Sequence, residues 1–237
     1  MRTRGDFRFK KFSISHDAST HKVGTDGVLL GAWVNVDGVS SILDIGTGSG
    51  VIAIMLAQRT PDHVVIEAVE LQEQDAIQAE KNVKNSPWPT KVRVIHTPVQ
   101  QFRPGKQFDL IVSNPPFFVN SWLPPDKNRS KARHSNELSF EDLLEAVTHS
   151  LSATGRFAVV LPFTEGNHFI RLAEGFGLHA HRQMSFRSRK EKPIERLLIE
   201  FSRQEGEMKR EELLLYKINE EWTDEYRRLT KDFYLNA

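Results

Sequence analysis

Short apolar runs and amphipathic helical segments alternate along this chain of 237 residues. The run "SSILDI" at 40–45 predicts a buried strand, and "GVIAIMLAQRT" at 50–60 has the length and periodicity of a helix. A strand, a helix and a strand follow at 64–71, 73–86 and 91–96. This alternation favours an α/β fold, in which a mostly parallel sheet carries helices on both faces.

The second half of the chain keeps the pattern. Its predicted elements are strands at 108–113, 155–162, near 178–185 and near 194–202, and helices at 139–151 and about 165–175. We therefore expect about seven strands in one sheet of Rossmann type, within a domain over 21–203. A basic segment over 1–20 precedes this domain, and a charged extension over 204–237 with a terminal helix follows it.

Composition excludes several kinds of site. The chain has no apolar run near the roughly 20 residues of a membrane helix, and the start "MRTRGDFRFKKF" lacks the apolar stretch of a signal peptide. We therefore expect a cytoplasmic protein that does not bind membranes. The absence of cysteine removes disulfides, thiolate zinc sites and thiol nucleophiles. His16, His21 and His134 have no metal-ligand spacing, so we expect no metal.

Three glycines, Gly46, Gly48 and Gly50, occupy the predicted turn between the first strand and its helix. Missing side chains at such a turn let a ligand approach the backbone closely. A dinucleotide fits poorly, because Val51 replaces a glycine of that fingerprint and Asp44 would repel a pyrophosphate. S-adenosylmethionine carries a sulfonium and an ammonium group and no phosphate, so the turn favours this cofactor.

Two further positions extend the cofactor hypothesis. Glu70 ends the next predicted strand, about 20 residues beyond the turn, where an acid can accept hydrogen bonds from both ribose hydroxyls. Taken alone, an acid at the end of a strand more often faces solvent, and only its pairing with the glycine turn favours ribose binding. Upstream, Gly24, Thr25 and Asp26 form a loop that either contacts the cofactor or caps a helix through residues 28–33.

The stretch "DLIVSNPPFF" ends a predicted strand with a polar residue, two prolines and two aromatic rings. Together with the glycine turn and the acid that ends the second strand, Asn114-Pro115-Pro116-Phe117 resembles the catalytic loop of class I S-adenosylmethionine-dependent methyltransferases, in their amino-methylating branch. The resemblance covers about residues 20–202. It implies a Rossmann-like fold and methyl transfer to a planar nitrogen.

The resemblance gives each loop residue a physical role. The side-chain carbonyl of Asn114 and the backbone carbonyl of Pro115 would accept the two hydrogens of an exocyclic amino group. Pro115 and Pro116 would hold these acceptors still, and Phe117 would stack on a flipped-out base. Fixed acceptors favour the pyramidal nitrogen that can attack a methyl group, so catalysis would depend on positioning without a dedicated base. A loop that merely covers the core would leave Asn114 unexplained.

Longer stretches narrow the resemblance. The stretches "FRFKKFSISHDASTHKVGTDGVLLGAW", "FDLIVSNPPF", "ARHSNELSFEDLL" and "KPIERLLIEF" are similar to the bacterial tRNA methyltransferases that modify adenine 37, beside the anticodon of valine tRNA, at N6. The partner implied is a tRNA anticodon stem-loop, bound by a monomer. The family's cofactor residues correspond to Lys22, Gly24, Thr25, Asp26, Asp44, Gly46, Gly48, Gly50, Glu70 and Asn114. Relatives commonly place an Asp after the third strand, where this chain has Pro98 and Val99, so we expect Val99 or Gln100 to contact the cofactor adenine instead.

Charge is unevenly distributed, although the chain sums to +1. Residues 1–11 carry +4, 126–134 carry +3 and 182–196 carry +4, which leaves −10 for the rest. Such segregation suggests a polyanionic partner, although charge runs are also common on solvated faces. With a tRNA substrate, the residues expected to contact phosphates are Arg8, Lys10, Lys11, Lys127, Arg129, Lys131 and Arg133.

Three other functions stay open at this point. Guanine N2 methylation of ribosomal RNA also uses an N-P-P-F loop, and only the RNA and the nitrogen that accept the methyl group distinguish it. Methylation of a glutamine amide in release factors would not require three basic segments. A non-catalytic RNA-binding module on the same scaffold is disfavoured, because Asn114 and Asp44 are both retained.

Overall fold

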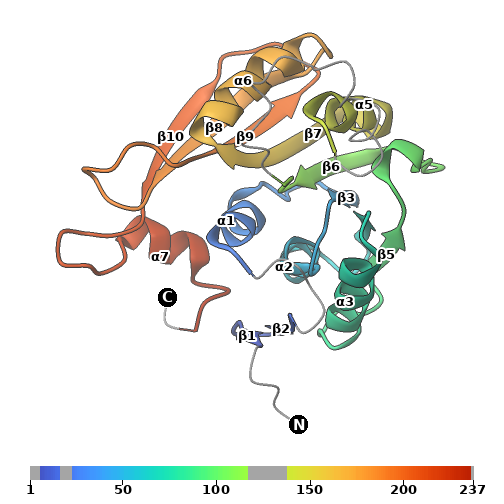
Figure 1. The fold of residues 1–237 in the computed structure, drawn as a ribbon, viewed down its shortest axis with the longest axis horizontal. Coiled ribbons are helices and arrows are strands. Elements are labelled where there is room, and N and C mark those ends of the chain that lie inside the picture. The colour runs from blue at the N-terminus through green and yellow to red at the C-terminus, as the bar shows by residue number, and fades with distance from the viewer. Residues whose placement is uncertain (1–5, 17–22, 117–137, 236–237) are drawn as a thin grey trace, which may run out of the picture.

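The computed structural model describes residues 6–16, 23–116 and 138–235 of the chain. One sheet of eight strands runs through the molecule in the order β10-β8-β9-β7-β6-β3-β4-β5 (Figure 1). Its strands are β3 (Ser41–Ile45), β4 (Val65–Glu70), β5 (Val92–His96), β6 (Phe108–Ser113), β7 (Leu151–Pro162), β8 (His179–Arg187), β9 (Arg196–Ser202) and β10 (Lys209–Leu214). Neighbouring strands are parallel except for β9, which is antiparallel to both β7 and β8. The predicted α/β class with a mostly parallel sheet is confirmed.

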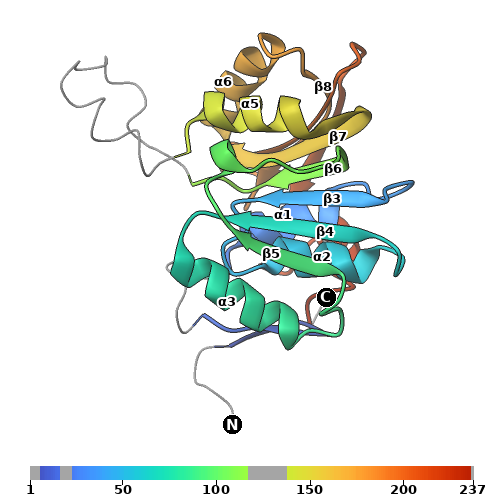
Figure 2. The same ribbon diagram turned by 90° about the vertical axis from the view of Figure 1, so that its right-hand side faces the viewer.

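Helices cover both faces of the sheet (Figure 2). They are α1 (Thr25–Trp33), α2 (Val51–Arg59), α3 (Glu73–Lys84), α5 (Phe140–Ser150), α6 (Phe163–Glu174) and α7 (Asp224–Thr230), with a short 3-10 helix, η1 (Val99–Gln101). One buried apolar cluster joins α1, α2 and α7 to one face, and a second joins α5 and α6 to the other. The strands between the two clusters read as nearly continuous apolar runs because both of their faces are buried.

The sheet has one strand more than the sequence predicts. Strand β10 lies within the stretch we expected to be a charged extension, and it pairs in parallel with β8 at the edge of the sheet. Its sequence, "KREELL", is charged because an edge strand keeps much of its side-chain surface in water, and charged side chains also protect a free edge. Only Leu213 of this strand is fully buried.

The first residues of the described chain form a two-stranded hairpin, β1 (Phe7–Arg8) and β2 (Ser13–Ile14). Between and after its charged residues, the hairpin inserts Phe9, Phe12 and Ile14 into the core cluster of α1 and α2. The sequence analysis predicted a basic segment from its positive charge. In the structure, the aromatic residues that alternate with these charges attach the segment to the domain. This attachment brings the two ends of the described chain together, since the Lys10 N–H donates to the Phe233 carbonyl at 2.8 Å.

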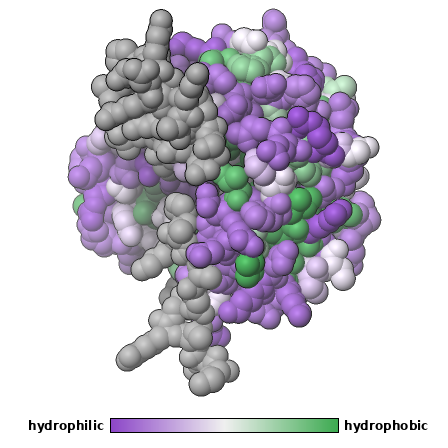
Figure 3. Space-filling view, turned by 45° about the vertical axis from the view of Figure 1, so that its right-hand side comes forward, coloured by the Kyte–Doolittle hydropathy of each residue, from purple (hydrophilic) through white to green (hydrophobic). Residues whose placement is uncertain are grey.

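The surface on the side of β5 and α3 is mostly hydrophilic (Figure 3), in keeping with the charged, amphipathic sequence of α3. No helix among the described residues has the length and hydropathy needed to span a bilayer. Within the same ranges, no group of three or more histidine or acidic side chains has an arrangement suited to a metal ion.

Candidate active site

Three predicted site residues lie close together at the carboxyl ends of the central parallel strands, which we call the carboxyl edge of the sheet. Ile45 of β3 is paired with Ser113 of β6, and the Ser113 hydroxyl donates to the Ile45 carbonyl at 2.8 Å. Neighbouring strands lie about 4.8 Å apart. Gly46 and Asn114, the next residue of each chain segment, therefore lie side by side, and Glu70 ends β4 on the other side of β3. This edge is where open parallel sheets bind ligands.

The glycine turn combines an open part and a closely packed part. Gly46, Gly48 and Gly50 have φ values of +71°, +55° and +82°, a region that residues with side chains rarely adopt. A Cβ on Gly46 or Gly48 would meet no atom within 4 Å, whereas one on Gly50 would lie 3.4 Å from the Ala79 Cβ of α3. The first two glycines therefore expose backbone to a ligand, and the third lets α2 begin against α3.

Asp44 is fully buried at the end of β3. Its Oδ2 accepts a hydrogen bond of 2.6 Å from the Thr47 hydroxyl, and its Oδ1 has no hydrogen-bond partner among the described residues. Burial raises the pKa of Asp44 to about 7, the Thr47 hydrogen bond and the nearby Ala53 backbone N–H oppose this rise, and the charge of Glu70 adds to it. A cationic ligand group would favour the charged carboxylate and would give Oδ1 a partner.

Glu70 contacts the glycine turn itself. Its Oε2 accepts the Gly48 N–H at 2.8 Å and its Oε1 accepts the Gln72 N–H at 2.9 Å. The side chain is nearly buried, so these two bonds fix its orientation. A carboxylate has about four acceptor positions, so each oxygen can still accept a ribose hydroxyl, and that role stays a prediction.

Asn114 begins the predicted catalytic loop where α1 and α2 both start. A Cβ added to Gly27 of α1 would lie 3.8 Å from the Asn114 Nδ2 and 3.4 Å from Cγ1 of Val51 at the start of α2. The Asn114 Oδ1 is buried and has no hydrogen-bond partner among the described residues. Pro115 is buried and Pro116 is exposed. Within the ranges that the structure describes, the site thus contains two buried oxygens that lack a partner, one on Asp44 and one on Asn114.

Comparison with known proteins agrees with this geometry. The model of the methyltransferase small domain family matches residues 23–182. A protein of Trichodesmium erythraeum (strain IMS101), named tRNA1(Val) (adenine(37)-N6)-methyltransferase, is 44% identical over 232 residues, which cover 97% of each chain. The chain belongs to the tRNA1(Val) (adenine(37)-N6)-methyltransferase family. The prediction that it is a methyltransferase of this family is confirmed.

Solved structures support the fold. A predicted O-methyltransferase of Agrobacterium tumefaciens superposes with a TM-score of 0.70 at 17% identity, over 88% of this chain and 96% of that one. The glycopeptide N-methyltransferase MtfA, solved with S-adenosyl-L-methionine, gives a TM-score of 0.57 at 14% identity, over 79% of this chain and 91% of MtfA. At these identities the likeness concerns the fold alone, and it confirms the Rossmann-like prediction.

Two residues predicted to contact the cofactor, Thr25 and Asp26, begin α1 and lie beside β9. Asp26 forms an ion pair with Arg196 of β9, with 2.8 Å between Oδ2 and Nε. A hollow of about 410 Å³ lies beside this pair, lined by Gly24, Thr25, Asp26, Phe186, Ser188, Glu195, Arg196 and Leu215. The family's loop residues therefore border the start of β9, while Gly27 brings the same helix to Asn114. Their contact with a cofactor stays a prediction.

The two candidates for the adenine contact differ in what they already bind. The side chain of Gln100 is exposed and its Nε2 donates to Oδ2 of Asp142 at 3.3 Å. Asp142 belongs to the capping box of α5, so Gln100 is directed toward that helix. Val99 is buried beside the edge where Glu70 ends β4, because the Thr97 N–H donates to the Glu70 carbonyl at 3.0 Å. The Val99 backbone is therefore the better placed of the two.

The predicted RNA contacts divide into two groups. Arg8, Lys10 and Lys11 are exposed on the N-terminal hairpin, where the Lys10 ammonium donates to the Lys231 carbonyl. Other predicted residues lie outside the described residues: Lys22, Phe117, Lys127, Arg129, Lys131 and Arg133, and with them His21 and His134.

The third basic segment, 182–196, is largely neutralised by acids that come from elsewhere in the chain. Its ion pairs are Arg182 with Glu211, Arg187 with Glu212, Arg189 with Glu220 and Arg196 with Asp26. Three of the four acids follow β9 in the sequence, in or after β10. A sum of charge within one window could not reveal this compensation, because the acids lie in other segments.

Sequence reasoning missed two residues of the site. Thr47 occupies a variable position of the glycine motif, yet its hydroxyl is a partner of Asp44. A hydroxyl three residues after a buried acid was the available signal. Asn82 of α3, whose Nδ2 donates to the Ser49 carbonyl of the glycine turn at 2.9 Å, gave no signal, since a single asparagine in a charged helix is ordinary.

Proposed function

We propose that this protein transfers a methyl group from S-adenosylmethionine to the exocyclic N6 of adenine 37 in valine tRNA. Membership of the family supports the reaction and the substrate. The observation that carries the proposal is the buried Asn114 Oδ1, which has no hydrogen-bond partner within the described ranges. A buried acceptor without a partner is costly to the folded protein, and a donor from a substrate removes that cost.

The glycine turn and its acids fit the cofactor. The buried Asp44 Oδ1 would accept a hydrogen bond from the ammonium group, and the open backbone at Gly46 and Gly48 leaves space for the adjoining atoms. Glu70 would accept hydrogen bonds from the ribose hydroxyls with its remaining lone pairs. Lys22, Gly24, Thr25 and Asp26 would border the same ligand, as their counterparts in the family imply. The cofactor supplies an electrophilic methyl group when it is bound.

The loop after β6 would position the acceptor nitrogen. The Asn114 side chain and the Pro115 backbone carbonyl would accept the two amino hydrogens, which holds the nitrogen in the geometry for in-line attack. Pro115 is buried and cannot rotate about φ, so the loop begins rigidly. Phe117 would stack on the flipped-out adenine. No general base is assigned, because the fixed acceptors take up charge that develops on the amino group.

Basic residues would bind the anticodon stem-loop through its phosphates. Arg8, Lys10 and Lys11 are exposed and supply one such surface, and we assign the second to residues Lys127, Arg129, Lys131 and Arg133. A protein with this substrate acts where tRNA is found, so the proposal includes a cytoplasmic location. It also treats the enzyme as a monomer.

The decisive test is single-turnover transfer of labelled methyl to an unmodified transcript of valine tRNA. A matched transcript with guanine at position 37 is the control, and mass spectrometry of the digested product identifies the methylated nucleotide. We expect N6-methyladenosine at position 37 and no label on the control. Equal labelling of both transcripts, or transfer to guanine N2 of ribosomal RNA under the same conditions, would contradict the assignment.

A further inference from the structure

Asn82 of α3 joins two segments that are far apart in the sequence. Its Nδ2 donates to the Ser15 carbonyl at 3.1 Å and to the Ser49 carbonyl at 2.9 Å, and its Oδ1 accepts the Ser15 N–H at 3.0 Å. The same Oδ1 also accepts a bond of 3.3 Å from the Gln78 Nε2. A side-chain amide offers two donors and two acceptor lone pairs. All four are used here, in a side chain that is 1% exposed.

One segment is the glycine turn of the proposed cofactor site, and the other is the end of the N-terminal hairpin. Ser49 lies inside the glycine turn, between Gly48, whose N–H is held by Glu70, and Gly50, which packs against α3. Ser15 directly follows β2 and lies at the end of the N-terminal hairpin, on the way to the loop that contains Gly24. The paired bonds between Asn82 and the Ser15 backbone resemble a bridge between strands, so they fix that segment against α3.

We propose that Asn82 is a positioning residue for the cofactor: it sets the glycine turn through Ser49 and ties the N-terminal hairpin to that turn through Ser15. The inference rests on the proposed function for the identity of the ligand. Glu70 holds the turn from β4 and Asn82 holds it from α3, so the two contacts fix its backbone at adjacent residues, Gly48 and Ser49. The basic hairpin and the cofactor site are thereby coupled through one side chain.

The first test measures the affinity of S-adenosylhomocysteine by calorimetry. Asn82→Ala should bind it about tenfold more weakly, as expected for loss of a buried hydrogen bond that positions the turn. The KM for S-adenosylmethionine should rise by a similar factor, while kcat at saturating cofactor should change less than about twofold, because removing binding that is equal in the ground and transition states raises KM alone.

Val83→Ala is the matched control. Val83 neighbours Asn82 on α3 and is 5% exposed, but it belongs to the apolar core and its side chain cannot form a hydrogen bond with the turn. It should lower the melting temperature without changing cofactor affinity. Unchanged affinity in Asn82→Ala, or an equal loss in Val83→Ala, would overturn the inference, since a general loss of stability would then explain the result.

A second measurement keeps the inference separate from the proposed function. Hydrogen exchange of the ligand-free protein should be faster in peptides covering residues 46–50 of Asn82→Ala than of the wild type, with β6 unchanged. If Asn82→Ala does not fold, Asn82→Ser keeps a neutral polar side chain and can donate at most one of the two bonds, and the same comparison applies. Wild-type protein that fails to bind S-adenosylhomocysteine would refute the cofactor assignment alone. Unchanged exchange at 46–50 would refute the role of Asn82.

Discussion

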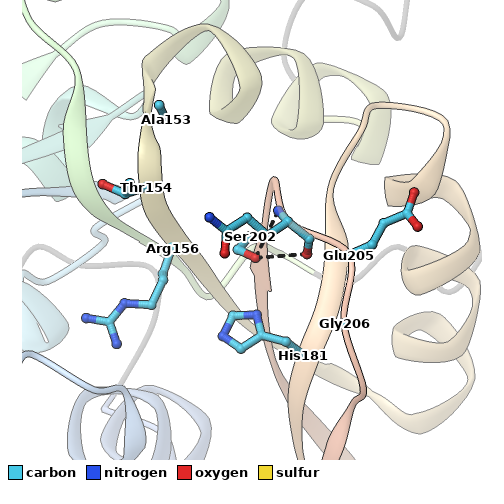
Figure 4. A pocket seen from close by; sticks show the side chains of 8 residues that line it. Ala153, Thr154, Arg156, His181, Ser202, Glu205 and Gly206 are labelled. Atoms are coloured by element: carbon cyan, nitrogen blue, oxygen red, sulfur yellow. Dashed lines mark hydrogen bonds between the residues drawn. The ribbon is translucent and has the colours of Figure 1, made fainter.

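The two edges of the sheet differ in the backbone that surrounds their buried polar groups. At the amino ends of β7 and β8, a hollow of about 500 Å³ is lined by Arg156, His181, Ser202 and neighbouring residues (Figure 4). Arg156 there donates to the Asp37 carbonyl, His181 bonds to Glu200, and the Ser202 hydroxyl bonds to the backbone of Gln204. At the carboxyl edge, Asp44 and Asn114 each keep a buried oxygen without a partner among the described residues.

The difference teaches that volume alone does not identify a site. The hollow at the amino ends is roomy, and beside it the His181 and Glu200 side chains bond to each other at 3.0 Å. The carboxyl edge instead combines open glycine backbone with buried acceptors that a ligand can satisfy. Nδ1 of His181 and Oε2 of Glu200 also lack a partner within the described part of the chain, so the hollow differs from the carboxyl edge in lacking a turn of glycines with positive φ.

The largest effect is expected from Asn114→Ala, because this change removes an acceptor where charge develops in the transition state. The single-turnover rate of methyl transfer should fall about a hundredfold or more. Binding of S-adenosylhomocysteine and of tRNA should change little. Ser113→Ala is the matched control, since its buried hydroxyl already bonds to the Ile45 carbonyl. A near-normal rate in Asn114→Ala would remove the main difference between the two edges.

Asp44→Asn should weaken binding of the cofactor and should stabilise the ligand-free protein above about pH 7. Burial raises the pKa of Asp44 from 3.8 to about 7, so the folded protein binds this proton more tightly than the unfolded chain does. The contribution of Asp44 to the stability of the ligand-free protein is therefore lost as the pH rises from about 4 to about 7. Over this range the unfolded state binds fewer protons than the folded state. At about pH 8 the variant should be more stable by on the order of 4 kcal/mol, from a shift of about 3 pKa units at about 1.4 kcal/mol each. Its affinity for S-adenosylhomocysteine should fall at least about tenfold, since the ammonium loses its charged partner.

The measurements for Asp44→Asn are denaturant unfolding across this pH range and calorimetry. Glu80→Gln, an exposed carboxyl change on α3, should alter neither quantity. A gain in stability that persists unchanged at about pH 4 would contradict the electrostatic cause, because Asp44 in the folded protein would then be neutral, like the asparagine that replaces it.

The sequence predicted most of the sheet and the residues of its carboxyl edge, because apolar runs and glycine turns are local signals. Strand β10 escaped prediction, since an edge strand with one buried leucine has the composition of a charged extension. The contacts of Asp26 and Asn82 could not be predicted, because their partners, Arg196 and Ser15, are distant in the sequence. Local patterns thus identify which residues can act, and the tertiary fold decides which of them are already paired.

The N-terminal hairpin should contribute a smaller effect on RNA binding. Replacing Arg8, Lys10 and Lys11 with Ala should weaken tRNA affinity several-fold. The slope of log Kd against log salt concentration should fall by up to about 0.8 for each phosphate that the variant no longer neutralises. Cofactor affinity should be unaffected. Arg189→Ala is the control, because its ion pair with Glu220 offsets its charge, and we expect little change in salt dependence. Equal effects of the two variants would show that pairing does not decide which basic residues meet RNA.

The smallest effect on catalysis is expected at the opposite edge, in His181→Ala. Glu200 is 3% exposed and His181 is its hydrogen-bond partner there, so the change leaves a buried carboxyl unsatisfied and should cost about 1–3 kcal/mol of stability. His181→Gln retains an N–H that can reach Glu200 and should recover part of that loss. The rate of methyl transfer per folded molecule should stay within about twofold of the wild type in both variants, measured below their melting temperatures, because mutations distant from the site act through stability. A larger loss of activity in His181→Ala that His181→Gln does not restore would mean that the hollow at the amino ends takes part in the reaction.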